Sequence, residues 1–192
     1  MEVFSRRKFL ASAGIAATAY GSRPLLSQLA AMSPFKVAVI SDEISQDFDH
    51  ACSVAAHEFG LQWIELRAMW NKSLQALTDS EIADAQKILA KYSLRVTDIA
   101  SPLFKVDWPE ASPTSHTRPG HTMNSTETFK QQDDVLERSI SLAKQFKTDK
   151  VRCFDFWRLE DVTPYRKAID AKLQEAATVC GKQGILLVLE NE

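Results

Sequence analysis

The sequence predicts an α/β protein in which strands and helices alternate around a parallel sheet. One observation is the order of patterns, because apolar runs of strand length alternate with stretches that have helical spacing. Another is the run at residues 184–189, which is apolar at consecutive positions after its glycine and is followed by Glu-Asn-Glu at 190–192. Such a run is typical of a parallel strand buried on both faces, with its polar tip emerging where ligands bind. With 45% apolar and 25% charged residues, the 192-residue chain can bury a sizeable core, and one domain is expected.

The elements follow one another regularly along the chain. Five strands are predicted, over residues 35–41, 61–66, 94–101, 150–156 and 185–189. Four helices are predicted between them, over residues 47–59, 78–92, 129–146 and 163–183. Thr78 and Glu81 have the spacing of a capping box, and Thr163-Pro164 is a typical helix start. The stretch between residues 103 and 128 is rich in Pro, Ser and Thr and has no sustained period, which predicts a long loop.

Periodicity alone leaves two architectures open for this alternation: an open doubly wound sheet and a closed barrel. The residues after the first strand bear on the choice, because positions 41–45 read Ser-Asp-Glu-Ile-Ser and contain no glycine. A dinucleotide pyrophosphate therefore has no glycine-rich turn to bind there, which argues against the open-sheet dinucleotide fold.

The first residues predict a targeting segment, residues 1–31, that is separate from the fold at 32–192. Residues 5–10 read Ser-Arg-Arg-Lys-Phe-Leu, and the mildly apolar stretch at 11–20 is too short to span a bilayer. This pattern resembles a twin-arginine export signal. It implies export to the periplasm, or anchoring at the membrane if the segment is not cleaved.

Charge and cysteine content exclude several classes of function. The net charge of −2 and the pI near 6.1 do not give the basic domain that binds nucleic acid or an anionic membrane. The three cysteines, Cys52, Cys153 and Cys180, are far apart and form no C-x-x-C pair, so we expect small buried side chains.

Polar side chains follow every predicted strand, and in a barrel these ends would meet at one rim. They are Asp42 and Glu43, Glu65 and Arg67, Ser101, Asp155 and Arg158, and Glu190 and Glu192. Carboxylates gathered at one rim repel each other unless a cation lies among them, which favours a divalent metal with oxygen ligands. The alternative, that these residues cap helices or face water, stays open for Asp42, Glu43 and Asp155 and is favoured for Glu192.

Other candidate residues are aromatic or histidine. Phe154, Phe156 and Trp157 could stack on the apolar face of a sugar or pack in the core. His116 and His121 could be metal ligands, but their spacing in a Pro-rich loop fixes no geometry, so solvated histidines are the preferred interpretation.

From about residue 35 to 192 the chain resembles the front part of a xylose-isomerase-like TIM barrel. That superfamily contains sugar phosphate isomerases and epimerases and the endonuclease-IV type of abasic-site nuclease. The resemblance rests on residues 59–66, 150–158 and 187–191. It implies a partial (β/α)8 TIM barrel with the first five strands and four helices. It also implies that Glu190 is a catalytic residue and metal ligand and that Glu65 lies in the substrate pocket. We add Arg67, Asp155 and Trp157 as predicted substrate-binding residues.

The predicted function is that of a sugar or sugar phosphate isomerase or epimerase that moves a proton next to a carbonyl. The resemblance implies a divalent metal, Mn2+, Mg2+, Co2+ or Zn2+, whose other ligands come from strands six to eight. We therefore expect a C-terminally truncated chain that is inactive alone, or, less favoured, a homo-oligomer in which two halves close one barrel. The alternatives are an endonuclease-IV-type phosphodiesterase and a non-catalytic carbohydrate-binding protein. A small-molecule carbohydrate is the expected partner, with no nucleic acid.

Overall fold

The computed structural model describes residues 35–112 and 128–190, and from Lys36 onwards these residues form one compact unit. The predicted targeting segment, the two loop histidines and Glu192 lie outside the described residues. Within the described ranges, no helix has both the length and the apolar character needed to cross a membrane.

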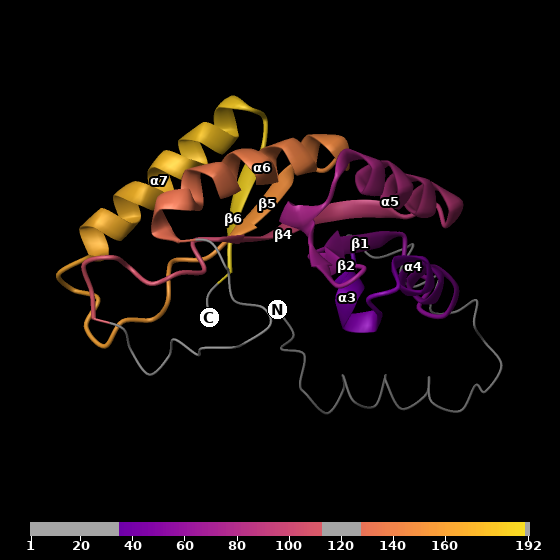
Figure 1. Ribbon diagram of the computed structural model, residues 1–192, viewed down its shortest axis with the longest axis horizontal. Coiled ribbons are helices and arrows are strands. Elements are labelled where there is room, and N and C mark those ends of the chain that lie inside the picture. Colours follow the sequence, from indigo (N-terminus) through magenta and orange to yellow (C-terminus); the bar gives the residue numbers. More distant parts are fainter. Residues whose placement is uncertain (1–34, 113–127, 191–192) are drawn as a thin grey trace, which may run out of the picture. The chain divides into compact units, whose positions relative to one another are not determined.

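A parallel sheet of four strands organises the unit (Figure 1). Its strands, in spatial order, are β1 (Trp63–Leu66), β4 (Arg95–Leu103), β5 (Lys150–Cys153) and β6 (Leu186–Leu189). An isolated parallel bridge between Ile40 and Glu65 adds a further segment beside β1. Strands that are neighbours in this sheet are thus also consecutive members of the sheet along the chain. A doubly wound sheet reverses its order part of the way across, so the sequential order observed here is that of a barrel.

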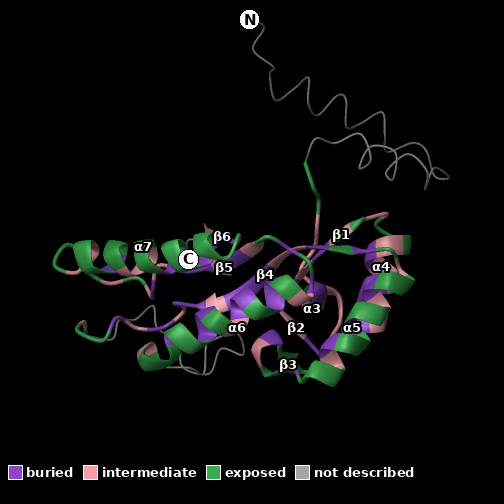
Figure 2. Cartoon of the chain, turned by 90° about the horizontal axis from the view of Figure 1, so that it is seen from above, coloured by how far each residue is buried: buried purple, intermediate pink, exposed green. Residues whose placement is uncertain are grey.

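Helices connect the strands and bury one side against them (Figure 2). They are α3 (Ser41–Ile44), α4 (Phe48–His57), α5 (Asp79–Lys91), α6 (Gln132–Gln145) and α7 (Arg166–Lys182). Shorter elements are the antiparallel hairpin β2 (Ala68–Met69) and β3 (Lys72–Ser73), and the 3-10 turns η2 (Leu74–Ala76) and η3 (Phe129–Gln131).

Alternate positions of the strands supply the core. Ile64 and Leu66 of β1 and Val151 and Cys153 of β5 are at most 2% exposed, whereas the residues between them are half-buried. Because successive side chains of a strand point to opposite faces, one face of the sheet is apolar and the other carries polar groups. All three cysteines are free and buried, as predicted.

The capping box predicted for the second helix is confirmed. The Thr78 side chain accepts a hydrogen bond from the Glu81 backbone N–H at 3.3 Å, and the Glu81 carboxylate accepts one from the Thr78 N–H at 2.8 Å. Two backbone amides that would otherwise be free at the start of α5 are therefore satisfied locally, which is why this boundary could be identified from sequence.

The first predicted strand, residues 35–41, is wrong in its extent. It contributes only the bridge at Ile40, and the chain then turns into α3, with Ser45 N–H bonded to the Ser41 carbonyl at 3.3 Å. The Ser41 hydroxyl is buried and donates to the Ala68 carbonyl, which fixes this turn against β2. A contact 27 residues away cannot be read from local periodicity.

Other boundaries also shift. The strand predicted over residues 150–156 ends at Cys153, and the helix predicted from 163 begins at Arg166. The apolar run at 184–189 was expected to be buried on both faces, but Leu186 and Leu189 are each 57% exposed. In the described part of the chain β6 pairs with β5 alone, so its other edge is uncovered.

Candidate functional site

A β-bulge on β4 shapes the polar face of the sheet. Ile64 pairs with Val96 but Leu66 pairs with Ile99, so β4 has one more residue than β1 between the two pairs. The extra residue brings Asp98 into the electrostatic surroundings of Glu65. Bulges commonly re-aim a side chain in this way beside functional sites.

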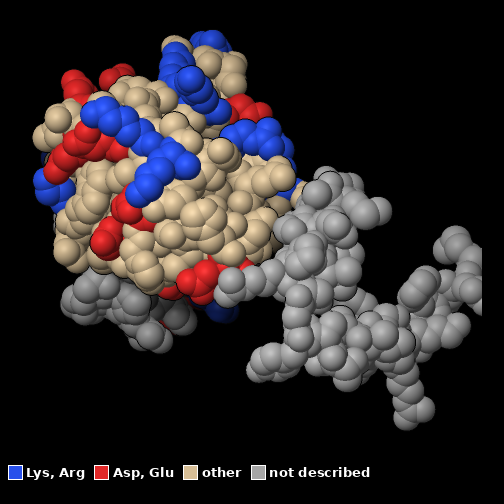
Figure 3. All heavy atoms as spheres, turned by 90° about the vertical axis from the view of Figure 1, so that its right-hand side faces the viewer, with Lys and Arg blue, Asp and Glu red and all other residues tan. Residues whose placement is uncertain are grey.

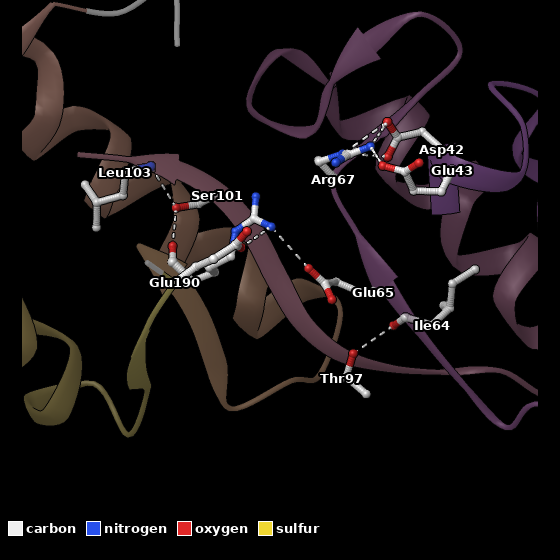
Figure 4. A network of polar contacts seen from close by, with 10 residues as sticks. Asp42, Glu43, Ile64, Glu65, Arg67, Thr97, Ser101, Leu103 and Glu190 are labelled. Atoms are coloured by element: carbon white, nitrogen blue, oxygen red, sulfur yellow. Dashed lines mark hydrogen bonds and ion pairs between the residues drawn. The ribbon is translucent and has the colours of Figure 1, made fainter. Parts of the chain in front are cut away.

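Arg152 lies at the centre of that face. Its Nη1 is 2.7 Å from Glu190 Oε2 and 3.5 Å from Glu65 Oε1 (Figure 4). The side chain is 12% exposed, and its guanidinium carbon lies 5.0 Å from the centre of the Phe154 ring. Its Nε is buried and has no hydrogen-bond partner among the residues that the structure describes. We name Glu65, Asp98, Arg152 and Glu190 the Arg152 cluster.

The backbone beneath this cluster is held by Ser101. The buried Ser101 hydroxyl donates to the Arg152 carbonyl at 2.7 Å and accepts from the Leu103 N–H at 3.1 Å. It fills an irregular stretch of the β4–β5 pairing, between the Ile99 pair and the Leu103 pair. Ser101 was predicted as a polar strand end, and its role here is to position the strand that carries Arg152.

The cluster shifts the pKa of two of its carboxyls. Burial, reinforced by the negative charge of Asp98 and more weakly that of Glu190, raises the pKa of Glu65 to about 7, although Arg152 opposes the shift. Burial also raises the pKa of Asp98. A carboxyl that titrates near neutrality can both take and return a proton at physiological pH, so Glu65 has the acidity that proton-transfer catalysis needs.

Arg67, predicted to bind substrate, is occupied by a second set of ion pairs. Its Nε lies 3.1 Å from both carboxylate oxygens of Asp42, and its Nη2 lies 2.9 Å from Asp42 and 2.6 Å from Glu43 (Figure 4). We name these three residues the Arg67 clamp. The clamp joins α3 to the residue after β1, and the two carboxylates occupy Nε and Nη2 of the guanidinium.

Asp155 and Trp157, the other predicted substrate-binding residues, lie apart from these contacts. Asp155 is 3.7 Å from Arg166 at the start of α7. The Trp157 N–H donates to the Val106 carbonyl, and the Lys105 ammonium lies 5.4 Å from the indole centre. Neither shares a hydrogen bond or ion pair with the Arg152 cluster in the described ranges. Their roles in binding stay predictions.

The aromatic side chains near the ends of β4 and β5 form a packed cluster. Phe156 stacks on Phe104 with 4.9 Å between ring centres and meets the edge of Trp108 at 5.0 Å. Phe154 and Phe156 are 3% and 6% exposed. The core-packing interpretation therefore holds for both, because Phe156 packs against other aromatic rings and the buried ring of Phe154 has Lys105 and Arg152 against it.

The described residues do not form a divalent-metal site. They contain no group of three His, Cys, Asp or Glu side chains placed to hold one ion. Glu190, the predicted metal ligand, has a carboxylate oxygen 2.7 Å from a guanidinium nitrogen, a position in which a second cation would be repelled. His50 lies in the first turn of α4 and His57 is its last residue, so neither is on the polar face of the sheet.

Sequence reasoning singled out neither Arg152 nor Asp98 as a site residue. A signal for Arg152 was present, because it lies between apolar Val151 and Cys153 in a predicted strand. Alternation along a strand places it on the face opposite to those two buried side chains. Asp98 could not be found in this way, since the bulge that brings it toward Glu65 depends on pairing with β1.

No family model and no curated protein matches the chain. Solved structures do. A xylose isomerase-like TIM barrel/4-hydroxyphenylpyruvate dioxygenase fusion protein matches 83% of the chain at 14% identity, with a TM-score of 0.57. A xylose isomerase-like TIM barrel protein from Mycobacterium smegmatis, in complex with magnesium, matches 81% of the chain at 17% identity, with a TM-score of 0.52. An AP endonuclease of family 2 from Brucella melitensis matches 80% of the chain at 16% identity, with a TM-score of 0.50.

These similarities concern part of each larger protein. The chain covers 22% of the fusion protein, 55% of the Mycobacterium smegmatis protein and 53% of the AP endonuclease. At 14 to 17% identity they show the fold. The predicted partial TIM barrel is thereby confirmed: over about four fifths of its length, this chain has the fold of the xylose isomerase-like TIM barrels.

Proposed function

We propose that the chain carries part of the active site of a sugar isomerase or epimerase that transfers a proton next to a carbonyl. The observation that carries the proposal is the Arg152 cluster, in which a carboxyl with a pKa near 7 adjoins a buried guanidinium on the polar face of the sheet. The fold shared with xylose isomerase-like TIM barrels is consistent with a carbohydrate substrate.

Glu65 is the group that takes and returns the proton in this proposal. General acid–base catalysis is most effective when the pKa of the catalytic group lies near the working pH. Its side chain is 23% exposed, so most of it is shielded from water while part of it faces outward on this side of the sheet.

Arg152 stabilises the negative charge that develops on the substrate oxygen as the proton leaves. A guanidinium has five N–H donors, and among residues 35–112 and 128–190 the buried Nε of Arg152 has no hydrogen-bond partner. A donor already fixed in place costs little reorganisation during the reaction. Glu190 holds the guanidinium from the side of β6 through its 2.7 Å ion pair.

The metal dependence predicted for this function stays a prediction. One similar structure is a magnesium complex. In this chain the described residues offer one predicted ligand, and it is paired with Arg152, so no step is assigned to a metal here. A homo-oligomer likewise stays a prediction.

An endonuclease-IV-type phosphodiesterase is less favoured. The similarity to the AP endonuclease is one of fold. On the face in Figure 3 acidic and basic side chains are interspersed, whereas binding to DNA takes a continuous basic surface. The two described histidines belong to α4 and do not approach the polar face as metal ligands.

The test is hydrogen–deuterium exchange in D2O, followed by proton NMR, on a panel of aldoses and ketoses with and without phosphate. The protein purified from its native source is measured beside the 192-residue chain. We expect the native protein to wash out the signal of the C–H next to the carbonyl of at least one sugar. Arg152→Lys should slow this exchange at least tenfold, an order-of-magnitude expectation for a displaced donor. Arg95→Lys, an exposed arginine at the start of β4 whose guanidinium contacts Gln62, is the matched control. Absence of exchange with every sugar would overturn the proposal.

We also propose export of the chain by the twin-arginine route, on the basis of Arg6 and Arg7. Replacing both by lysine keeps the charge but removes the recognised pair. We expect the variant to remain in the cytoplasm while the unaltered chain reaches the periplasm, as measured by cell fractionation. Equal periplasmic amounts of both proteins would contradict this assignment.

A further inference from the structure

We propose that the chain binds an anionic phospholipid surface through the edge of the sheet at which the strands begin. We name this edge the amino-terminal rim. It lies at the opposite end of β6 from Glu190 of the Arg152 cluster. The proposal therefore concerns a second surface, and it goes beyond the proposed catalytic function.

Two lysines lie along the rim at the starts of the strands. The sheet is parallel, so the first residues of its strands share one edge, and Lys150 is the first residue of β5. Lys36 reaches the same edge, because its ammonium lies 4.3 Å from the centre of the ring of Trp63, the first residue of β1. Lys150 and, more weakly, Lys36 lower the pKa of Asp149, which shows that both ammonium groups lie near it.

The helices that lead back to the strands end at this rim and bring further lysines. Lys144 lies in the last turn of α6, and Lys147 follows that helix. Lys182 is the last residue of α7. The Lys144 ammonium donates to the side chain of Gln183, so the ends of α6 and α7 adjoin. We name as rim lysines the residues Lys36, Lys144, Lys147, Lys150 and Lys182.

The protein itself neutralises few of these charges. Among residues 35–112 and 128–190, Lys150 is the one rim lysine with a carboxylate in ion-pair range, and its partner is Asp149 at 2.6 Å. Glu58, beside the start of β1, is a further carboxylate on this side. The net charge of −2 does not reveal the rim, since the Arg67 clamp and the Arg152 cluster contribute five carboxylates and two guanidiniums elsewhere.

Helix stability alone does not account for the rim lysines. The helix dipole favours a cation in the last turn, which covers Lys144 and Lys182. Lys147 lies beyond α6 with a φ of 57°, in the left-handed region where glycine has no steric cost. Gly60 and Gly184 take that conformation after α4 and α7, with φ of 67° and 73°. A lysine at this turn is explained by its charge rather than by the backbone.

Apolar side chains are exposed among these cations. Val37 is 50% exposed, Phe59 51% and Leu186 57%. Val37 follows Lys36, Phe59 lies between α4 and β1, and Leu186 pairs with Lys150. On a membrane, cations bind anionic headgroups while neighbouring apolar groups enter the interface. An acidic protein or a nucleic acid would use the cations and leave the apolar side chains without a role, so a lipid surface is the favoured partner.

The position of the rim in the chain favours the same partner. The residues that precede Lys36 are joined to the compact unit at this rim. Among them are residues 1–31, the predicted targeting segment, which would act at a membrane. A chain delivered or held through that segment would meet the bilayer beside the rim lysines.

The experiment is lysine footprinting of the full 192-residue chain. Acetic anhydride is applied without vesicles, with phosphatidylcholine vesicles, and with vesicles of phosphatidylcholine and phosphatidylglycerol, and each lysine is quantified by mass spectrometry. On the anionic vesicles we expect acetylation of Lys36, Lys147 and Lys182 to fall at least about threefold. Lys130 and Lys167, exposed lysines in η3 and at the start of α7, lie toward the other end of the sheet and should keep their reactivity.

A variant measures the contribution of one charge. Lys147→Gly removes a cation and suits the left-handed backbone, so the variant should fold at least as well as the unaltered chain. Its affinity for the anionic vesicles, measured by co-sedimentation, should fall about fivefold, as expected for one lysine near an anionic surface. Lys167→Gln, the matched control, should leave the affinity unchanged. Added salt should weaken binding.

The footprint separates the rim from the targeting segment. Attachment through residues 1–31 alone would bring the chain to the vesicles but leave the rim lysines as reactive as Lys130, and this result would overturn the proposal. Equal protection on both kinds of vesicle, or protection by polyglutamate or duplex DNA and not by vesicles, would also overturn it, because the partner would not be an anionic lipid. Proton exchange on sugars in solution is a separate measurement, so the proposed function stands or fails independently.

Discussion

Two arginines of this protein, Arg67 just after β1 and Arg152 in β5, are each paired with two carboxylates. In the Arg67 clamp both carboxylate oxygens of Asp42 accept hydrogen bonds from Arg67, and the Asp42 side chain is 4% exposed. In the Arg152 cluster the contact to Glu65 is 3.5 Å, the Glu190 side chain is 47% exposed, and Nε of Arg152 has no hydrogen-bond partner in the described part of the chain.

The difference separates a structural ion pair from a site. The Arg67 clamp stabilises one arrangement of α3 against β1, because Asp42 and Glu43 together accept four hydrogen bonds from Nε and Nη2 of Arg67. A cluster with an unused buried donor and a carboxyl titrating near pH 7 retains unmet capacity for binding and for proton transfer. Arg67 follows a predicted strand and Arg152 lies within one, and it is the partners of each arginine that distinguish their roles.

The largest expected effect is on catalysis. Glu65→Gln in the native protein should lower the exchange rate at least about 100-fold, because it removes the group that takes the proton. Glu43→Gln, the exposed carboxylate of the Arg67 clamp, should change the rate less than about twofold, since we assign it no catalytic role. The D2O exchange assay measures both, and similar losses in the two variants would erase the distinction drawn here.

For stability we expect the opposite ranking: loss of the arginine should cost more in the Arg67 clamp than in the Arg152 cluster. Arg67→Met leaves Asp42 buried without a counter-charge, so we expect the free energy of unfolding to fall by about 3 kcal/mol. Arg152→Met should lower it by only about 1 kcal/mol at pH 7, because Glu190 can reach water and Glu65 can take up a proton. Urea denaturation of both variants provides the comparison. A larger loss for Arg152→Met would show that the cluster is the structural one.

The smallest effect is the pH dependence of the cluster. The pKa of Glu65 is raised above its usual value of 4.5 to about 7, so the folded state holds this proton more tightly than the unfolded chain. The resulting stabilisation is complete below pH 4.5 and is lost as the pH rises through 7. Glu65→Gln removes that loss, and at pH 8 we expect its Tm to exceed that of the unaltered chain by roughly 2–4 °C, after allowance for solvent screening.

The control for this measurement is Glu81→Gln. Its carboxylate belongs to the capping box and the pair with Lys72, which hold its pKa low, at about 2. A lowered pKa stabilises the fold above pH 4.5 and loses that contribution as the pH falls toward 2, which is the opposite sign. At pH 8 this variant should therefore have a lower Tm. An equal Tm for Glu65→Gln and the unaltered chain at pH 8 would contradict the assigned pKa.

The sequence by itself determined the features that arise from neighbouring residues. Strand and helix alternation, the capping box of Thr78 and Glu81, and burial of the cysteines each depend on local spacing and on apolar character. These allowed the parallel α/β fold to be predicted, and resemblance added the barrel. The face on which Glu190 lies was also predictable, because alternation along a regular strand sets it.

Only the tertiary structure decided which side chains meet. Asp98 joins the cluster through a bulge that exists because β4 pairs with β1 out of step, and Arg67 is taken out of the site by carboxylates about 25 residues earlier in the chain. Both effects result from pairing between segments that are distant in sequence, which local spacing does not encode. The sheet order, the partners of each arginine and the exposure of β6 have the same origin: they are set by what each strand lies beside.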